Sequence, residues 1–117
     1  ATNRRVTGLK HANWDKLPLE PVREGVARKV FSGEKATLVM NYLQPGHEPK
    51  PHRHPHEQIA YIISGHCDFH VNDEVIRLGP GDVIHIPSNA LHYAEVVGNE
   101  ILVNLDVFSP RRDDYGG

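Results

Sequence analysis

The sequence lacks the features that mark disulfide scaffolds, membrane spans and nucleic-acid-binding proteins. Cys67 is the one cysteine among 117 residues, so no disulfide can form within the chain, and we expect a reducing, cytoplasmic location. No apolar run approaches the roughly 20 residues of a membrane span, and residues 1–14 contain no apolar stretch of the signal-peptide type. The formal net charge is −2, which provides no basic field for nucleic acid or an anionic membrane. We expect neither as a partner.

Long helical periodicity is also missing. The chain divides instead into short runs rich in β-branched and aromatic residues, separated by Gly, Pro, Asn and Asp. The expected strands are Val26–Phe31, Ala36–Leu43, Glu57–Ser64, His66–Val71, Glu74–Leu78, Asp82–Ile86, His92–Val97 and Glu100–Phe108. This pattern predicts an all-β sandwich or barrel with only short peripheral helices. We expect residues 1–117 to form one domain, with a barrel core at about residues 24–110 between an N-terminal arm and a C-terminal tail.

Alternation along the last expected strand separates an apolar face from a mixed one. One side carries Ile101, Val103, Leu105 and Val107, and the other carries Leu102, Asn104, Asp106 and Phe108. The mixed face could be exposed to solvent, or it could line a polar cavity inside a barrel.

Histidine is abundant, with nine residues in the chain. His52, His54 and Gln58 have the same parity, so in an extended chain they point to one side, whereas Glu57 points to the other. Same-face neighbours are about 6.6–6.8 Å apart, and two imidazoles at that spacing can tilt toward one ion. Pro55 interrupts the run, and histidines on a solvent-exposed surface are the plain alternative.

The other histidines receive different interpretations. His56 follows the bend at Pro55, and we expect it at the rim of a site rather than as a ligand. His66 and His70 alternate with Cys67, Phe69 and Val71, so they should lie on the outer surface. His85 could line a pocket or lie in a subunit contact.

The residues around these histidines resemble the two sequence motifs of the cupin family. Gly46, His52-Arg53-His54, Gln58 and Gly65 are spaced as in the first motif, and Gly81, Pro87 and His92 as in the second. The resemblance covers about residues 24–115. It implies a double-stranded β-helix, the cupin jelly-roll barrel, with His52, His54, Gln58 and His92 as ligands of one divalent metal ion. Gln58 replaces the usual glutamate, Asn89 a usual glycine and Val96 a usual asparagine.

The ligand set that this resemblance implies carries no charge of its own. Three neutral imidazoles and an amide leave the 2+ charge of the ion uncompensated, which predicts a strong Lewis acid and an anionic substrate. A mainly imidazole set favours a transition metal (Zn, Ni, Fe, Mn or Cu) over Mg or Ca.

The C-terminal tail narrows the resemblance. His52 to Gln58 reads His-Arg-His-Pro-His-Glu-Gln, and Asp106 to Arg112 reads Asp-Val-Phe-Ser-Pro-Arg-Arg. Both segments resemble the small cupins that convert ring-closed 4,5-unsaturated uronates from pectin and alginate into open-chain keto acids. That resemblance implies that Asp106, Phe108 and Arg112 serve the active site.

Each tail residue then has an expected role and a plainer alternative. Asp106 could be the general acid/base, or a solvated strand carboxylate. Arg112 could clamp the substrate carboxylate with two parallel hydrogen bonds, or form a tail ion pair with Asp113 or Asp114. Phe108 could cover the face of the sugar.

Other functions are compatible with the same frame. An iron-dependent cupin dioxygenase acting on a diketone or aromatic substrate would bind Fe(II) and consume oxygen. A metal-dependent polyketide cyclase or lyase, and a non-catalytic binding cupin, are further alternatives. We expect a small anionic molecule as the substrate. We also expect a homodimer, because Ile59, Tyr61 and Ile63 point outward and would need cover, although a second sheet could cover them equally well.

Overall fold

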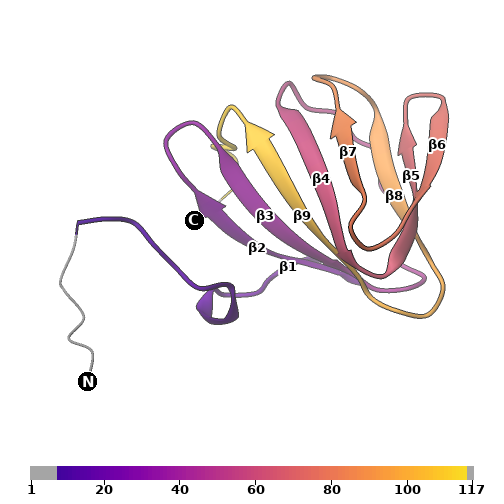
Figure 1. Ribbon diagram of the computed structural model, residues 1–117, viewed down its shortest axis with the longest axis horizontal. Helices are drawn as coiled ribbons and strands as arrows, with labels where there is room; N and C mark the ends of the chain where they lie inside the picture. The colour runs from indigo at the N-terminus through magenta and orange to yellow at the C-terminus, as the bar shows by residue number, and fades with distance from the viewer. Residues whose placement is uncertain (1–7, 116–117) are drawn as a thin grey trace.

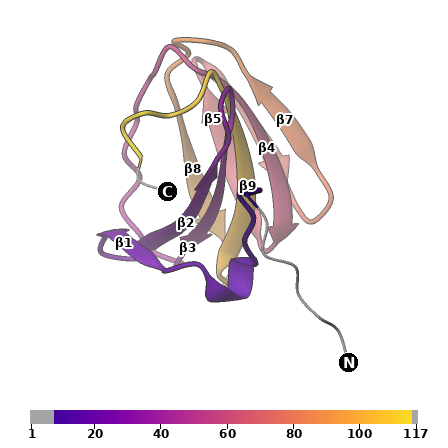
Figure 2. The same cartoon turned by 90° about the vertical axis from the view of Figure 1, so that its left-hand side faces the viewer.

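The computed structural model describes residues 8–115 as two antiparallel β-sheets that face each other (Figures 1 and 2). The larger sheet has the order β1 (Glu20–Arg23), β2 (Val26–Ser32), β3 (Thr37–Leu43), β9 (Leu102–Ser109), β4 (Glu57–Ser64) and β7 (Val83–Ile86). The smaller sheet has the order β6 (Glu74–Leu78), β5 (His66–Val71) and β8 (His92–Val97). Within the described residues the helical structure is one 3-10 turn, η1 (Trp14–Lys16), and no helix there is long and apolar enough to cross a membrane. The predicted all-β class is confirmed.

The sequence pattern missed one strand. Each of the expected strands is present with small differences at its ends, but β1 was not expected, and the large sheet therefore begins at Glu20 rather than near residue 24. β1 is a short edge strand that contains Pro21, and its pairing with β2 shifts register between Pro21 and Arg23. A four-residue strand with a proline and an irregular register has no alternation to detect, and edge strands are where both are tolerated.

Strand β9 is central to the large sheet because it pairs with β3 on one side and β4 on the other. Its mixed face, Leu102, Asn104, Asp106 and Phe108, is buried, while the alternate side chains are half-buried. The mixed face therefore points inward, and the cavity interpretation is correct.

Strand register arranges the inward-facing side chains of the large sheet in rows. The three rows that matter here are Ser32–Thr37–Phe108–Gln58, Val30–Val39–Asp106–Ala60 and Arg28–Asn41–Asn104–Ile62. Neighbouring rows are about 6.6–6.8 Å apart along the strands. Residues far apart in the sequence are thus placed within side-chain reach of one another.

The apolar core lies between the two sheets at the corner where β4 continues into β5. Ala60 and Ile62 of β4 pack with Cys67 and Phe69 of β5, and all four are buried. Gly65 makes the corner with φ +81°, and a Cβ there would lie 2.6 Å from a backbone carbonyl oxygen. Only glycine combines that conformation with that close approach.

The outer face of β4 is exposed. Ile59, Tyr61 and Ile63 are 44%, 42% and 40% exposed, and Val83 of β7 lies directly across from Tyr61. The second sheet therefore does not cover these side chains, and the homodimer stays a prediction.

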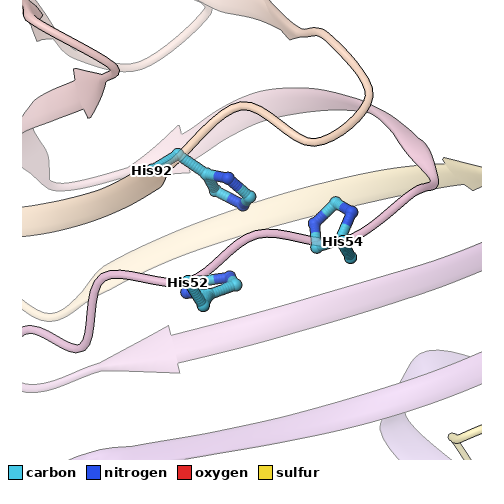
Figure 3. Close-up of side chains that lie close together, drawn as sticks. All are labelled: His52, His54 and His92. Carbon is cyan, nitrogen blue, oxygen red and sulfur yellow. The ribbon is translucent and has the colours of Figure 1, made fainter.

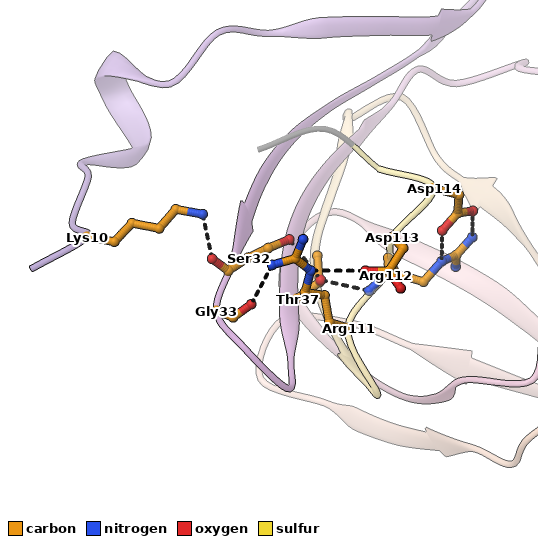
Figure 4. Close-up of polar contacts among 8 residues, drawn as sticks. All are labelled: Lys10, Ser32, Gly33, Thr37, Arg111, Arg112, Asp113 and Asp114. Carbon is orange, nitrogen blue, oxygen red and sulfur yellow. Dashed lines mark hydrogen bonds and ion pairs between the residues drawn. The ribbon is translucent and has the colours of Figure 1, made fainter.

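The C-terminal tail folds back across the hairpin of β2 and β3 (Figure 4). The backbone N–H of Arg112 donates to Thr37 Oγ1 at 2.9 Å, and Thr37 Oγ1 lies 2.9 Å from Ser32 Oγ. Arg111 Nη1 donates to the Gly33 carbonyl at 3.3 Å. These buried and peripheral contacts anchor the tail, so that the Tyr115 ring lies 6.0 Å from the Phe108 ring.

Candidate metal centre

Three histidines converge from two separate parts of the chain, His52 and His54 from the segment before β4 and His92 from the start of β8 (Figure 3). His52 and His92 form an isolated antiparallel bridge, with His92 N–H donating to the His52 carbonyl at 2.9 Å and His52 N–H to the His92 carbonyl at 3.1 Å. Directly opposed residues of an antiparallel pair point to the same side, so the two rings lie 4.3 Å apart. His54 joins them with its ring 4.8 Å from that of His92.

A backbone carbonyl fixes the orientation of each ring. The Nδ1 atoms of His52, His54 and His92 lie 2.8, 3.0 and 2.8 Å from the carbonyl oxygens of Lys50, His56 and Ala90. A carbonyl can only accept, so each Nδ1 carries the proton and each neutral ring presents a lone pair at Nε2. This is the outer hydrogen bonding typical of metal-ligating histidines.

The cluster fits a metal ion on two further observations. His92 Nε2 is buried and has no hydrogen-bond partner among the described residues, which is costly unless something else binds there. One ligand nitrogen from each ring lies within 4.8 Å of the other two. Two nitrogens bound to one ion at about 2.1 Å are at most about 4.2 Å apart, so each ring would need to move by less than about 1 Å.

Gln58, and not Glu57, faces this cluster. Gln58 is buried on β4 with its Oε1 3.1 Å from His54 Nε2. Its side chain also hydrogen-bonds Asp106, and a carboxylate requires the amide nitrogen as donor, so Oε1 points toward the lone pair of His54. Two facing lone pairs repel, and a bound cation beside them would remove that conflict. Glu57 points outward and accepts from His85 Nε2 at 2.9 Å.

Burial keeps two of the imidazoles unprotonated. It lowers the pKa of His92 to about 4, and it is also the largest cause that lowers the pKa of His54, with the charge of Arg112 next. Both rings are therefore neutral near pH 7, the form that binds a metal without first losing a proton.

Asp106 lies one row from Gln58, inside the cavity and buried. It accepts hydrogen bonds from Asn41 Nδ2 at 2.7 Å and Asn104 Nδ2 at 2.9 Å. Burial raises the pKa of Asp106 to about 7, and the hydrogen bonds from Gln58, Asn41 and Asn104 lower it in part. The structure therefore places Asp106 away from solvent, and the alternative of a solvated strand carboxylate does not apply.

Phe108 and Arg112 also lie beside the histidine cluster. The Phe108 ring is 5.3 Å from that of His54, and the Arg112 guanidinium lies 4.8 Å over Phe108. The bidentate edge of Arg112 is occupied by Asp114, with Nε–Oδ1 at 2.9 Å and Nη2–Oδ2 at 2.7 Å. The tail ion pair considered from the sequence is therefore formed, although Arg112 Nη1 is buried without a hydrogen-bond partner in the described chain.

The remaining histidines are peripheral to the cluster. His56 lies against His54 and Phe108, with ring separations of 5.6 and 6.4 Å. His66 is exposed, His70 is half-buried against Tyr93, and His85 pairs with Glu57 on the outer face.

The cavity contains groups that sequence reasoning missed. It has a volume of about 320 Å³, and its lining includes Arg23, Arg28 and Tyr115 beside His52, His92 and Asp106. Arg28 could have been found, because it shares parity on β2 with the buried Val26 and Val30. Tyr115 could not, since its position depends on how the tail folds back.

The comparisons with known proteins agree with this architecture. The family model for the cupin domain matches residues 39–108. The pectin degradation protein KdgF of Dickeya dadantii (strain 3937) is 31% identical over 103 residues, which cover 86% of this chain and 93% of that protein. The structure of KdgF from Halomonas sp. superposes with a TM-score of 0.79 at 33% identity, covering 87% of this chain and 95% of that one. An acireductone dioxygenase of Exiguobacterium sibiricum (strain DSM 17290 / CCUG 55495 / CIP 109462 / JCM 13490 / 255-15) is 35% identical over 72 residues, 52% of this chain and 40% of the dioxygenase.

Proposed function

The chain belongs to the cupin family, and from this premise we propose that it is a metal-dependent enzyme that converts ring-closed 4,5-unsaturated uronates into open-chain keto acids. One observation carries the proposal. The Gln58 side chain contacts both His54 of the candidate metal centre and Asp106, and Gln58 and Asp106 line one cavity together with His52 and His92. The similarity to the pectin degradation protein KdgF, which extends over most of both chains, supports a substrate that is released when pectin is degraded.

The residues of the cavity match the requirements of this isomerisation. Ring opening breaks the bond between the ring oxygen and the anomeric carbon while the anomeric hydroxyl loses a proton to become an aldehyde. The ring oxygen leaves as an enolate, which becomes the ketone when its carbon gains a proton, so one proton is lost and one is regained. The atoms balance without an oxidant or a co-reactant. Asp106 is the one carboxyl group in the described cavity lining, and we assign it the transfer of these protons.

The candidate metal centre would act on the substrate oxygens. His52, His54, Gln58 and His92 would hold the ion, which when bound supplies Lewis-acid stabilisation of negative charge on oxygen. Gln58 contributes no charge to it, and this favours an anionic substrate.

The tail residues complete the cavity. Phe108 is 3% exposed, lies beside His54 and provides an apolar surface for one face of a sugar ring. Arg112 packs on Phe108 while Asp114 holds its bidentate edge, so Arg112 supports this apolar surface. The volume of about 320 Å³ is near the lower limit for small-molecule sites and favours a monosaccharide over an oligomer.

A direct assay tests the proposal. The purified protein, loaded in turn with Zn, Ni, Mn and Fe(II), is incubated with the unsaturated monouronate released by a pectate or alginate lyase. We expect the ultraviolet absorbance of the conjugated acid to disappear faster than its spontaneous rate. Asp106→Ala and His92→Ala should abolish the acceleration, whereas Asp68→Asn, which removes a carboxylate on β5 that pairs with Arg77, should retain it.

A dioxygenase is the second candidate, because an acireductone dioxygenase is 35% identical over 72 residues, about half of this chain. It predicts oxygen consumption by the Fe(II)-loaded protein on an acireductone or diketone. Oxygen uptake on such a substrate, with no acceleration on the uronate in any metal form, would overturn the uronate proposal.

A further inference from the structure

Three basic side chains line the cavity and have no part in the reaction described above. Arg23 comes from β1, Arg28 from β2 and Lys50 from the segment before His52. Asp106 is the one acidic residue in that described lining. The wall therefore carries an excess of positive charge even before a metal ion is counted, and such a wall favours an anionic ligand.

Strand register places Arg28 close to Asp106. Arg28 lies directly across from Asn41 on β3, and Asn41 Nδ2 donates to Asp106 Oδ2 at 2.7 Å. Arg28 is two strands from β9, roughly 10 Å across the sheet, and one same-face step, roughly 7 Å, along it. Both side chains line the same cavity, so a ligand between them is of monosaccharide size.

The guanidinium of Arg28 stacks on an aromatic ring, and most of its N–H donors remain available for a ligand. It lies 3.8 Å over the Tyr115 ring, and the Arg28 side chain is 23% exposed. Its ion pair within residues 8–115 is a single contact from Nε to Glu20 Oε2 at 3.4 Å. Arg112, which lies 4.1 Å over the same Tyr115 ring, is instead paired with Asp114 through two short contacts. The fork of Arg28 is thus the more available of the two for a ligand carboxylate.

Arg23 lies in the same wall. The pairing of β1 with β2 shifts register between Pro21 and Arg23, and such an irregularity changes the direction of the side chains beside it. Arg23 Nε is buried and has no hydrogen-bond partner among the described residues. A buried donor of this kind requires an acceptor, and a ligand carboxylate in the cavity would be one.

We propose that Arg28 and Arg23 form the carboxylate-binding subsite of the cavity, with Arg28 as the residue that selects an acidic sugar. The subsite deepens the proposed function and rests on it for the identity of the substrate. The substrate carboxylate binds the fork of Arg28 with two parallel hydrogen bonds, and Arg23 Nε donates to it as well. Arg112 stays with Asp114 and acts as a positioning residue that holds Phe108 and Tyr115 in place.

Steady-state kinetics of charge-removing variants test the subsite. Arg28→Gln keeps a polar, uncharged amide on a shorter side chain and loses the charge and the two parallel N–H donors of the guanidinium. Arg77→Gln makes the same change at a strand arginine that pairs with Asp68 outside the cavity. On the unsaturated monouronate we expect Arg28→Gln to raise KM about 10- to 100-fold while kcat changes by less than about threefold. Arg77→Gln should leave both constants unchanged. Arg28→Lys keeps the charge without the fork and should give an intermediate KM.

Folding and metal content are measured on each variant, so that a lost structure is not read as lost binding. An unchanged KM in a folded, metal-loaded Arg28→Gln variant would overturn the subsite. A matching rise in Arg77→Gln would overturn it as well, because the effect would then come from overall charge.

A binding experiment separates this inference from the proposed reaction. If the wild-type protein does not consume the uronate, calorimetry with galacturonate and with neutral galactose is performed on the metal-loaded wild type and Arg28→Gln. A preference for galacturonate that disappears in Arg28→Gln supports the subsite although the proposed reaction has failed. Equal binding of the two sugars to the wild type refutes the subsite.

Discussion

Replacing Gln58 and Glu57 separately by alanine tests whether the fourth ligand position lies on the inner face of β4. The two residues are neighbours with opposite surroundings. Gln58 is 4% exposed and contacts His54 and Asp106, whereas Glu57 lies outside with 55% of its side chain exposed and pairs with His85. Of these two residues, only Gln58 should therefore affect the affinity for the metal.

The magnitudes differ enough to be measured. Removing an outer hydrogen-bond partner of a metal ligand typically weakens metal binding about 10- to 100-fold, and the loss of a direct ligand should be at least as large, about 1.4 kcal/mol or more. Gln58→Ala also removes one of the donors to buried Asp106, so the pKa of Asp106 should rise further above about 7. Glu57→Ala removes an exposed ion pair worth at most about 1 kcal/mol of folding stability, and it should leave metal affinity unchanged.

Equilibrium dialysis against a chelator of known affinity, followed by elemental analysis, measures the metal bound by each variant. Circular dichroism and thermal unfolding show whether both remain folded. If Glu57→Ala loses metal while Gln58→Ala binds it with wild-type affinity, the inward assignment of Gln58 as a ligand is wrong.

Three further predictions concern stability and reactivity. Gly65→Ala should lower the free energy of unfolding by about 3 kcal/mol or more, because a strained φ of +81° is joined by a 2.6 Å clash. Gly98→Ala, at φ +87° in open space, should cost only about 1–2 kcal/mol. The buried Cys67 thiol should be inert to Ellman's reagent at pH 8 until the protein unfolds, because burial raises its pKa to about 11. The hydrogen bonds from Arg112 lower the pKa of Asp114 to about 2, so their stabilising effect is complete above about pH 4 and is lost as the pH falls through about 2.

Each of these has a clear negative result. Denaturant titrations that give equal losses for the two glycine variants would show that the clash at residue 65 is relieved elsewhere. Full reaction of Cys67 in the native protein would place it outside the core. Asp114→Asn should remove part of the loss of stability between pH 4 and pH 2 in metal-free protein, and an identical profile for wild type and variant would show that the Arg112 pair is not formed in solution.

Periodicity and turn residues determined most of the secondary structure. Runs such as Glu57–Ser64 and His66–Val71 alternate clearly and end at Gly65 or an Asn-Asp turn, so local sequence was enough to locate them. Alternation also identified the face of β9 that carries Asn104, Asp106 and Phe108. The inward direction of that face was left open, because local pattern does not show what packs above a strand.

Gln58 faces inward as its parity with His52 and His54 predicts, but the backbone between them is not the extended strand that the prediction assumes. The prediction treats residues 52–58 as one extended run, but the structure contains only an isolated bridge at His52 and a bend at Pro55–His56 before β4 begins. The physical reason for the convergence is the pairing of His52 with His92, forty positions away. The resemblance to the second cupin motif implies His92 as a ligand, whereas no local property of the chain predicts that His92 lies beside His52.

Apart from the motif residues, only the tertiary structure determines which side chains line the cavity. Register brings Arg28 beside Asn41 and hence near Asp106. The hydrogen bond from the Arg112 backbone N–H to Thr37 holds the tail against the barrel, and the Tyr115 ring there contacts the guanidinium groups of both Arg28 and Arg112. The sequence determined which residue types recur with strand and motif spacing, because those depend on neighbours in the chain. Which charges share a cavity, and which arginine is already paired, depends on contacts between strands and tail that are remote in sequence, and only the folded chain specifies them.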